Sequence, residues 1–375
     1  MKILFISEYF PTDQYLDVHG GMEMRTYYVA KLLSYKHQVW VITSRLESKS
    51  KNKQINGINV IYAGITRSYS YIGSIGARII FSISAIYLGL FTEFDLVEGS
   101  GLLGWFPAYI LGILKKKKKV IIVADVSENY LTGFLKYMIS RFEKFIFKVS
   151  WNKIICISNT IKNYLTIYGI QEKSIETIYC GIDDKISNLS KKTNEKFNIV
   201  CVSRLVPYKR VLDLVKAVHL LSQKYPQIKL EIIGDGEEYK NIYDYINKYK
   251  LKNNIRLLGF IKKHQEVMDY IKRAYIFCLP SIVEGFGIVT IESLAQGVPV
   301  ILADLPIHHE ITENKGVIFF DPKNYIDLAD KLENVWEDEI LYKKLRTQGH
   351  EVSKQYTWQK TANKTGKLYE YLCSN

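Results

Sequence analysis

The sequence predicts an α/β protein of two domains, each built on a mainly parallel sheet. The order strand, glycine turn, helix recurs along the chain, which is typical of such sheets. The 375 residues are more than one hydrophobic core usually holds, so two domains are expected. Hydrophobic periodicity is lost over 184–196, where Ser, Asn and Lys accumulate as in a linker. We therefore expect domains at 1–185 and 186–357.

The first half opens with an apolar strand at Lys2–Ser7, and a polar loop follows that ends in His19-Gly20-Gly21. Helical spacing begins after these glycines, as at the start of a doubly wound sheet, although two glycines also form an ordinary helix-entry turn. Further strands are expected at 38–43, 59–63, 96–98, 120–124, 151–158 and 175–178.

Two strongly apolar segments, 75–91 and 102–114, lie between these strands. Neither segment is long enough and free enough of polar residues to span a bilayer, because a membrane-spanning helix needs about 20 apolar residues. We expect both to be crossover helices packed on the core, with docking at a membrane interface as the alternative.

A G-x-G-x-x-G pattern at Gly99–Gly104 follows a strand and opens a helix, and Asp125 ends the next strand. This is the dinucleotide-binding fingerprint in its usual context, with an acidic residue about 20 positions later. The position of the pattern argues against a dinucleotide site, because this strand–turn–helix unit is the fourth in the chain and the fingerprint is usual in the first. An enzyme that depends on NAD or FAD through Gly99–Gly104 is therefore the alternative prediction.

The second half begins with a strand at 198–202, followed by Arg204, Lys209 and a helix over 211–221. A guanidinium fork and an ammonium five residues later suit two phosphates, although two basic residues near a helix start are often plain surface. Further strands are expected at 230–233, 255–261, 275–279 and 300–303.

The segment after the strand at 275–279 is a loop with two glycines that leads into a helix. Free N–H groups and the positive end of the helix dipole suit a phosphate there. Glu284 at the loop and Glu292 in the helix would repel an anion unless they bind hydroxyls, so a polyol phosphate fits both. In the alternative, Glu284 caps the helix and Glu292 is solvated.

The pattern E-G-F-G-x-x-x-x-E-S-L-A-x-G-x-P-V at 284–300 resembles the signature of the retaining GT-B glycosyltransferases of family 4. The resemblance implies two Rossmann-like domains facing across a cleft: an acceptor domain at 1–185, completed by a C-terminal helix at about 358–375, and a donor domain at 186–357. It also implies a role for each matching residue. These roles are diphosphate binding by Gly21, Arg204, Lys209, Gly287 and Ile288, sugar contact by Glu284, ribose binding by Glu292, and base binding by the main chain at Phe260 and Ile261.

The sequence departs from the family in two places. Ala124-Asp125 stands where many members have a histidine, so either Asp125 orients the sugar or acceptor, or the protein is a non-catalytic nucleotide-sugar-binding subunit. Leu305–Glu310 replaces small residues and glycine. Adjacent histidines at 308 and 309 diverge on one turn, so we expect this segment to be a loop facing the sugar and not a metal site.

The function that the resemblance implies is retaining transfer of a hexose-type sugar from a nucleotide-diphosphate sugar. The positive net charge and the two apolar segments further suggest a glycan or lipid-linked acceptor. No metal or other cofactor is expected. Arg204, Lys209 and the loop at Gly287 would stabilise the departing diphosphate, which would deprotonate the acceptor during front-face attack. Glu284 as a covalent nucleophile is the weaker variant.

Composition bears on partners and location. The net charge is +13. No nucleic-acid module is recognisable and the aromatic residues follow core periodicity, so we expect no nucleic acid. An anionic membrane surface is the better partner, and a Lys-rich solvated surface is the alternative. The five cysteines lack paired spacing, and no signal peptide is recognisable. We expect a cytoplasmic protein, peripheral on the inner face of the cell membrane.

Overall fold

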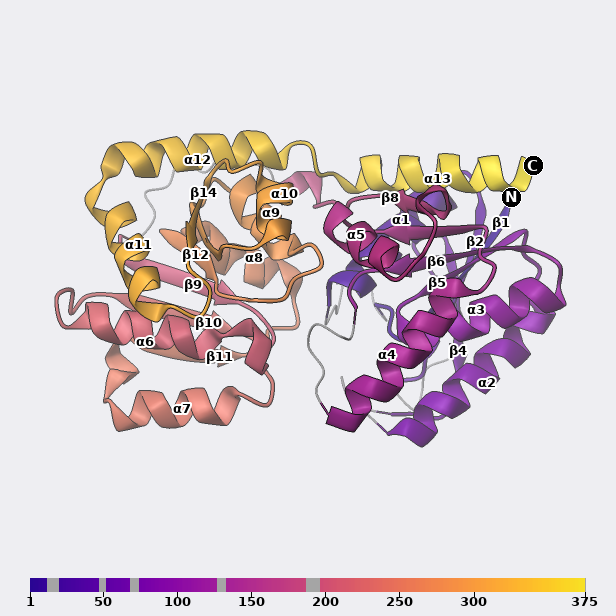
Figure 1. Ribbon diagram of the computed structural model, residues 1–375, viewed down its shortest axis with the longest axis horizontal. Helices are drawn as coiled ribbons and strands as arrows, with labels where there is room; N and C mark the ends of the chain where they lie inside the picture. Colours follow the sequence, from indigo (N-terminus) through magenta and orange to yellow (C-terminus); the bar gives the residue numbers. More distant parts are fainter. Residues whose placement is uncertain (12–19, 47–51, 68–73, 127–132, 187–195, 375) are drawn as a thin grey trace. The chain divides into compact units, whose positions relative to one another are not determined.

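The chain divides into two compact units. A computed structural model describes residues 1–11, 20–46, 52–67, 74–126, 133–186 and 196–374. Unit 1 comprises Met1–Gly181 with Trp358–Asn375, and unit 2 comprises Ile182–Thr357. Each unit places a sheet between layers of helices (Figure 1). The predicted α/β class with two parallel-sheet domains is confirmed.

Unit 1 has an eight-stranded sheet in the order β3-β4-β2-β1-β5-β6-β7-β8. Neighbouring strands are parallel except for the antiparallel pair of β3 and β4. The strands are β1 (Lys2–Ser7), β2 (Gln38–Ser44), β3 (Lys53–Ile55), β4 (Ile58–Ala63), β5 (Leu96–Ser100), β6 (Lys118–Val123), β7 (Lys153–Cys156) and β8 (Ile175–Thr177). The short β3 was not predicted.

Helices cover both faces of this sheet because the strand side chains alternate and are apolar on both sides. Leu4 and Ile6 of β1 join a core cluster with residues of α2 (Ile75–Phe91) and α3 (Leu102–Leu114). These two helices are the predicted apolar crossovers. The other helices of unit 1 are α1 (Gly21–Ser34), α4 (Gly133–Lys148), α5 (Asn159–Ile167) and α13 (Trp358–Ser374).

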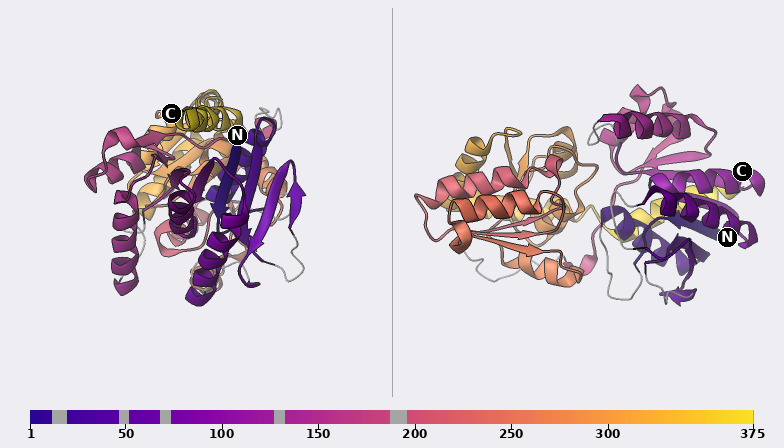
Figure 2. Two further views of the ribbon diagram at one scale, coloured as in Figure 1. Left: turned by 90° about the vertical axis from the view of Figure 1, so that its right-hand side faces the viewer. Right: turned by 90° about the horizontal axis from the view of Figure 1, so that it is seen from below.

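Helix α13 packs against α1 and brings the two chain ends close together, as all views show (Figures 1 and 2). The Trp358 ring stacks on the Tyr28 ring with centroids 5.0 Å apart. Deeper in unit 1, Tyr369 donates a hydrogen bond to Glu98, whose other oxygen lies 3.2 Å from Arg25 Nη1. All three side chains are fully buried, so α13 is part of the core of unit 1.

Unit 2 has a six-stranded, all-parallel sheet in the order β11-β10-β9-β12-β13-β14. The strands are β9 (Asn198–Val202), β10 (Lys229–Ile233), β11 (Ile255–Gly259), β12 (Ile276–Leu279), β13 (Val300–Ala303) and β14 (Val317–Phe320). The helices are α6 (Val211–Ser222), α7 (Tyr239–Lys248), α8 (His264–Arg273), α9 (Ile288–Ala295), α10 (Pro306–Thr312), α11 (Tyr325–Glu337) and α12 (Glu339–Ser353).

The predicted linker at 184–196 begins with a short 3-10 helix, Asp184–Ile186, and its remainder up to residue 195 lies outside the described residues, as does His19. Four of the five cysteines are buried as free thiols, and burial raises the pKa of Cys180 to about 12. Within the described parts of the chain, every helix is too short or too polar to cross a membrane.

Candidate active site

Strand order in unit 2 reverses between β9 and β12. From β9 the chain moves outward through β10 to β11, and then returns to the other side of β9 with β12, β13 and β14. In doubly wound sheets, ligands bind at such a switch point, outside the carboxyl ends of the strands. Arg204 and Lys209 follow β9 and Glu284 follows β12, so the sheet brings these three predicted residues to one place.

The loop after β9 is held by its neighbour after β10. Leu205 N donates to Asp235 O at 2.9 Å, and Ser203 N donates to Ile233 O at 3.0 Å. A Cβ at Gly234 would lie 1.8 Å from Ser203 O, so only glycine permits this approach. The Arg204 guanidinium donates to the Tyr208 hydroxyl at 2.8 Å.

The loop after β12 is bonded to the loop after β9. Ile282 N donates to Tyr208 O at 2.9 Å, and Lys209 Nζ donates to Glu284 Oε1 at 2.5 Å. The side chains of Lys209 and Glu284 are only 12% and 9% exposed, so Lys209 is not a plain surface residue. Gly287, with φ +76°, is the N-cap of α9 and has no side chain with which to cap it. Glu284 is therefore not the N-cap, and its carboxylate accepts from Lys209 instead.

Glu292 is buried on α9, at 3% exposure, which contradicts the alternative of a solvated residue. Its Oε1 lies 2.9 Å from His264 Nε2, at the start of α8. Burial lowers the pKa of His264, but the charge and hydrogen bond of Glu292, with the charge of Asp183, outweigh burial and raise this pKa above its ordinary value. His264 was not predicted from the sequence, because no spacing in the chain links a helix start to a glutamate on the next helix.

Phe260 and Ile261 follow β11, which ends at Gly259 and is shorter than the predicted strand. Phe260 is 39% exposed and Ile261 half-buried. Because β11 is parallel to β10 and β10 to β9, both residues lie at the same edge of the sheet as Arg204.

The segment 305–310 was predicted to be a loop, and this prediction is wrong. Pro306 begins α10, a position at which its missing N–H costs nothing. His308 is fully buried, and its Nδ1 donates to Ala303 O at 2.7 Å. Burial lowers the pKa of His308. Its Nε2 is buried and has no hydrogen-bond partner among the described residues.

His309 turns the other way, with Nε2 2.6 Å from Asp304 Oδ1. This bond and one to Asn314 raise the pKa of His309. The two histidines thus diverge, as their positions on one turn require. Within the described part of the chain, no three His, Cys, Asp or Glu side chains gather in a way that could hold a metal ion.

Gly21 and Asp125 belong to unit 1. Gly21 is the first residue of α1, and Asp125 is half-buried just after β6. Strands β1 and β6 both pair in parallel with β5. Asp125 therefore lies at the carboxyl edge of a sheet whose strand order also reverses, between β1 and β5.

Two of the three glycines of the G-x-G-x-x-G pattern, Gly99 and Gly104, have a packing role. A Cβ at Gly99 would lie 2.6 Å from Gly104 O, and a Cβ at Gly104 would lie 2.2 Å from Ile6 O. Both positions thus allow α3 to sit directly on β1 and β5. This close packing, together with the φ of +71° at Gly101, the N-cap of α3, accounts for the pattern without a bound dinucleotide.

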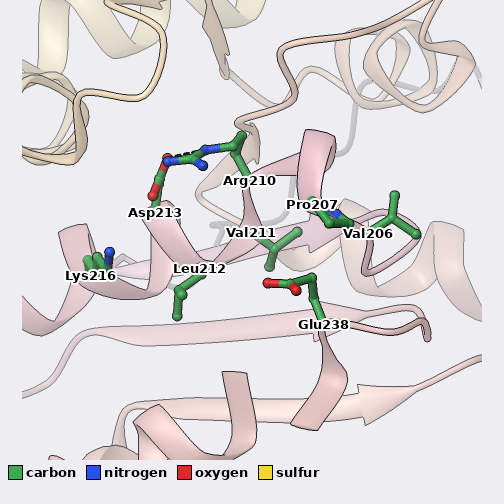
Figure 3. Close-up of a pocket in the computed structure, with 8 residues that line it drawn as sticks. All are labelled: Val206, Pro207, Arg210, Val211, Leu212, Asp213, Lys216 and Glu238. Carbon is green, nitrogen blue, oxygen red and sulfur yellow. Dashed lines mark hydrogen bonds and ion pairs between the residues drawn. The ribbon is translucent and has the colours of Figure 1, made fainter. Parts of the chain in front are cut away.

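A small cavity lies at the start of α6 (Figure 3). Its volume is about 120 Å³, and its lining residues are Val206, Pro207, Arg210, Val211, Leu212, Asp213, Lys216 and Glu238. Ligand sites usually measure about 300–1,000 Å³. Since neither Arg204 nor Lys209 lines it, this cavity is not the site at the switch point.

Comparison with known proteins covers most of the chain. Residues 183–352 match the model of glycosyl transferases group 1, and residues 19–185 match that of glycosyltransferase family 4. An uncharacterized glycosyltransferase of Methanocaldococcus jannaschii is 29% identical over 387 residues, covering 99% of each chain. The phosphatidylinositol N-acetylglucosaminyltransferase gpi3 subunit of Schizosaccharomyces pombe is 24% identical, covering 97% of this chain and 80% of that protein.

A solved structure extends this likeness to the fold. Anabaena HepE, in complex with UDP and glucose, superposes with a TM-score of 0.80 at 18% identity, covering 99% of this chain and 100% of that one. The two family models confirm the predicted family, and the alternative of an NAD- or FAD-dependent enzyme is not confirmed. This chain is a glycosyltransferase of the GT-B fold and belongs to group 1, family 4.

Proposed function

We propose that this glycosyltransferase moves a hexose-type sugar from a nucleotide-diphosphate sugar to a glycan or lipid-linked acceptor, with retention of configuration and without a metal. The observation that carries the proposal is the Lys209–Glu284 pair at the switch point of unit 2, next to Arg204. The complex of HepE with UDP and glucose makes a UDP-hexose the first donor to test.

The donor diphosphate would bind to the loop after β9 and to the N-terminus of α9. Arg204 and Lys209 supply positive charge, and Gly287 and Ile288 form the N-terminus of α9, where the first backbone N–H groups have no intrahelical acceptor. Gly21 is the predicted contribution of unit 1. These groups would stabilise the charge that develops on the leaving diphosphate.

The two glutamates would bind hydroxyl groups of the donor. Without a donor, Glu284 accepts from Lys209. Phosphate oxygens would compete for Lys209, so that binding of the diphosphate frees Glu284 for the sugar. Glu292, held by His264, would bind the ribose, and the main chain at Phe260 and Ile261 would bind the base.

The reaction would break the bond between the anomeric carbon and the diphosphate and form a bond from the acceptor oxygen on the same face of the sugar. The acceptor proton would pass to the departing phosphate oxygen. Asp125 is the predicted residue for orienting the sugar or acceptor in place of the family histidine.

We assign the acceptor to a surface glycan or a lipid carrier and the protein to the cytoplasmic face of the membrane. The net charge of +13 favours an anionic bilayer as the surface it meets. The S. pombe relative, named for transfer to phosphatidylinositol, supports a lipid-linked acceptor.

Thermal unfolding with UDP-, GDP- and ADP-sugars, NAD and FAD tests the donor assignment. A donor at a hundred times its Kd should stabilise the wild type by about 2.7 kcal/mol. Lys209→Ala should lose that shift, measured against its own ligand-free midpoint, whereas a control at the exposed Lys344 of α12, Lys344→Ala, should retain it. A shift with NAD or FAD alone would contradict the proposal.

A further inference from the structure

Helix α2 presents an apolar face to solvent. Large apolar side chains recur at every fourth residue and are exposed, with Ile75 at 70%, Ile83 at 63% and Phe91 at 75%. The complete set is Ile75, Ile79, Ile80, Ile83, Tyr87, Leu90 and Phe91. The opposite side of the helix, with Phe81 and Ala85, is buried in the core of unit 1. A surface helix normally places polar residues where α2 has these side chains.

The neighbouring helices continue this apolar face. Helix α3 packs closely on α2, since a Cβ at Gly89 would lie 2.3 Å from Leu111, and α4 contacts α3. The three helices lie next to one another in Figure 1. Helix α3 exposes Phe106, Ile113 and Leu114, and α4 exposes Tyr137, Met138 and Phe145. We call the exposed parts of α2, α3 and α4 the α2–α4 face.

The charges on the α2–α4 face are positive. The three helices contain a single carboxylate, Glu143, and it is buried at 3% exposure. Helix α4 alternates aromatic and basic residues on its exposed side, at Tyr137, Arg141, Phe145 and Lys148. Such a pattern is typical of helices that lie in a membrane interface.

Five consecutive lysines, Lys115–Lys119, follow α3. Lys115 Nζ donates to Leu90 O and Thr92 O, at 3.0 and 2.7 Å, which places this run at the end of α2. The two carboxylates beyond that end, Glu93 and Asp95, are paired with Lys2 and Lys117. The apolar surface therefore has a basic rim.

We propose that the α2–α4 face docks onto an anionic lipid bilayer, with its apolar side chains in the interface and its basic residues against the headgroups. Because Phe81 and its neighbours anchor α2 to the sheet, the helix would lie on the bilayer without crossing it. A second copy of the chain is the weaker occupant, since two faces that both carry basic residues repel each other.

This inference deepens the proposed function, because a lipid-linked acceptor would be met at the same bilayer. Its test nevertheless uses neither donor nor acceptor. The full-length protein is floated with phosphatidylcholine vesicles and with vesicles that also contain phosphatidylglycerol, at low and high salt. The wild type should float only with the anionic vesicles, and less at high salt.

The informative variant is Ile79→Gln/Ile83→Gln, which removes two exposed side chains and should not disturb the core. Its vesicle affinity should fall about tenfold or more. The matched control, Ile167→Gln/Ile340→Gln, changes two isoleucines that are 77% and 82% exposed elsewhere and should float like the wild type. Arg141→Gln/Lys148→Gln should lose affinity mainly at low salt.

Two results would overturn the proposal: wild type that stays at the bottom with both kinds of vesicle, or Ile79→Gln/Ile83→Gln that floats like the wild type. Sedimentation analysis tests whether a second copy of the chain binds the α2–α4 face instead. A dimer that dissociates in Ile79→Gln/Ile83→Gln without any change in flotation would assign the α2–α4 face to self-association. Donor-induced thermal shifts should be equal in all these variants, so failure of the donor assignment would be recognised separately.

Discussion

Lys209 Nζ donates a hydrogen bond to Glu284 Oε1 at 2.5 Å, and this bond joins the loops that follow the adjacent strands β9 and β12. Both side chains are largely buried. Each ion therefore depends on the other for its charge partner while no phosphate is bound. The pair links the stability of unit 2 to the donor site.

The first prediction concerns this ion pair. Lys209→Met should lower the free energy of unfolding by about 3–5 kcal/mol, because it leaves the Glu284 charge buried without its partner. Lys209→Met/Glu284→Gln should recover part of this loss. Urea unfolding measures the free energy of unfolding of both variants, and Lys344→Met serves as the surface control. If the double variant is no more stable than Lys209→Met, the two residues do not act as a pair.

The second prediction concerns pH and the His264–Glu292 pair. The folded pKa of His264 is raised, so its stabilisation is complete below the unfolded value of about 6.5 and is lost as pH rises through the folded pKa. The stability advantage of the wild type over His264→Gln should therefore shrink as the pH rises above about 6.5. Urea unfolding at a series of pH values on both sides of this point checks it. An advantage that is constant or grows with pH would rule out a charged His264.

The third prediction concerns the contact between the loops after β9 and β10. Gly234 has φ +140° and no room for a Cβ beside Ser203 O. Gly234→Ala should therefore cost at least about 2 kcal/mol more stability than Gly259→Ala. Gly259 is a fair control because it has φ +70° in the same sheet but no atom within 4 Å of its Cβ position. Equal losses would show that strain, and not the close approach, limits both sites.

The fourth prediction concerns the attachment of α13 to unit 1. Tyr369→Phe removes the hydroxyl that donates to the buried Glu98 and should cost about 1–3 kcal/mol. Tyr371→Phe, on the same helix but 63% exposed, should change stability by less than about 0.5 kcal/mol. Thermal unfolding of the two variants makes the comparison. No difference between them would mean that Glu98 keeps its partners without Tyr369.

The sequence predicted most of the sheet strands because both halves repeat the same apolar strands and glycine turns. It also indicated Glu284 through a long motif and Lys209 through its spacing from Arg204, but not their hydrogen bond, which joins loops after two strands whose order no spacing reveals. The partner of Glu292 was missed because it lies on a different helix, and no spacing predicts which helices pack together. Gly99–Gly104 was open to two interpretations because close packing of a helix on a strand requires the same glycines as a dinucleotide site.

The error at 305–310 has a different origin. Departure from a family pattern suggested a loop, yet Pro306 is a good first residue for a helix, and His308 fits the core once its Nδ1 reaches Ala303 O. Burial of a polar residue depends on the partner that the fold supplies, which the local sequence does not show.

The most direct test of the account is calorimetric titration of the preferred sugar nucleotide and its 2′-deoxyribose analogue into wild type, Lys209→Ala and Glu292→Gln. The account predicts that the wild type prefers the natural donor by about tenfold, that Glu292→Gln loses this preference, and that Lys209→Ala binds both ligands more weakly. If Lys209→Ala binds like the wild type and Glu292→Gln keeps the preference, the donor does not lie at the switch point of unit 2.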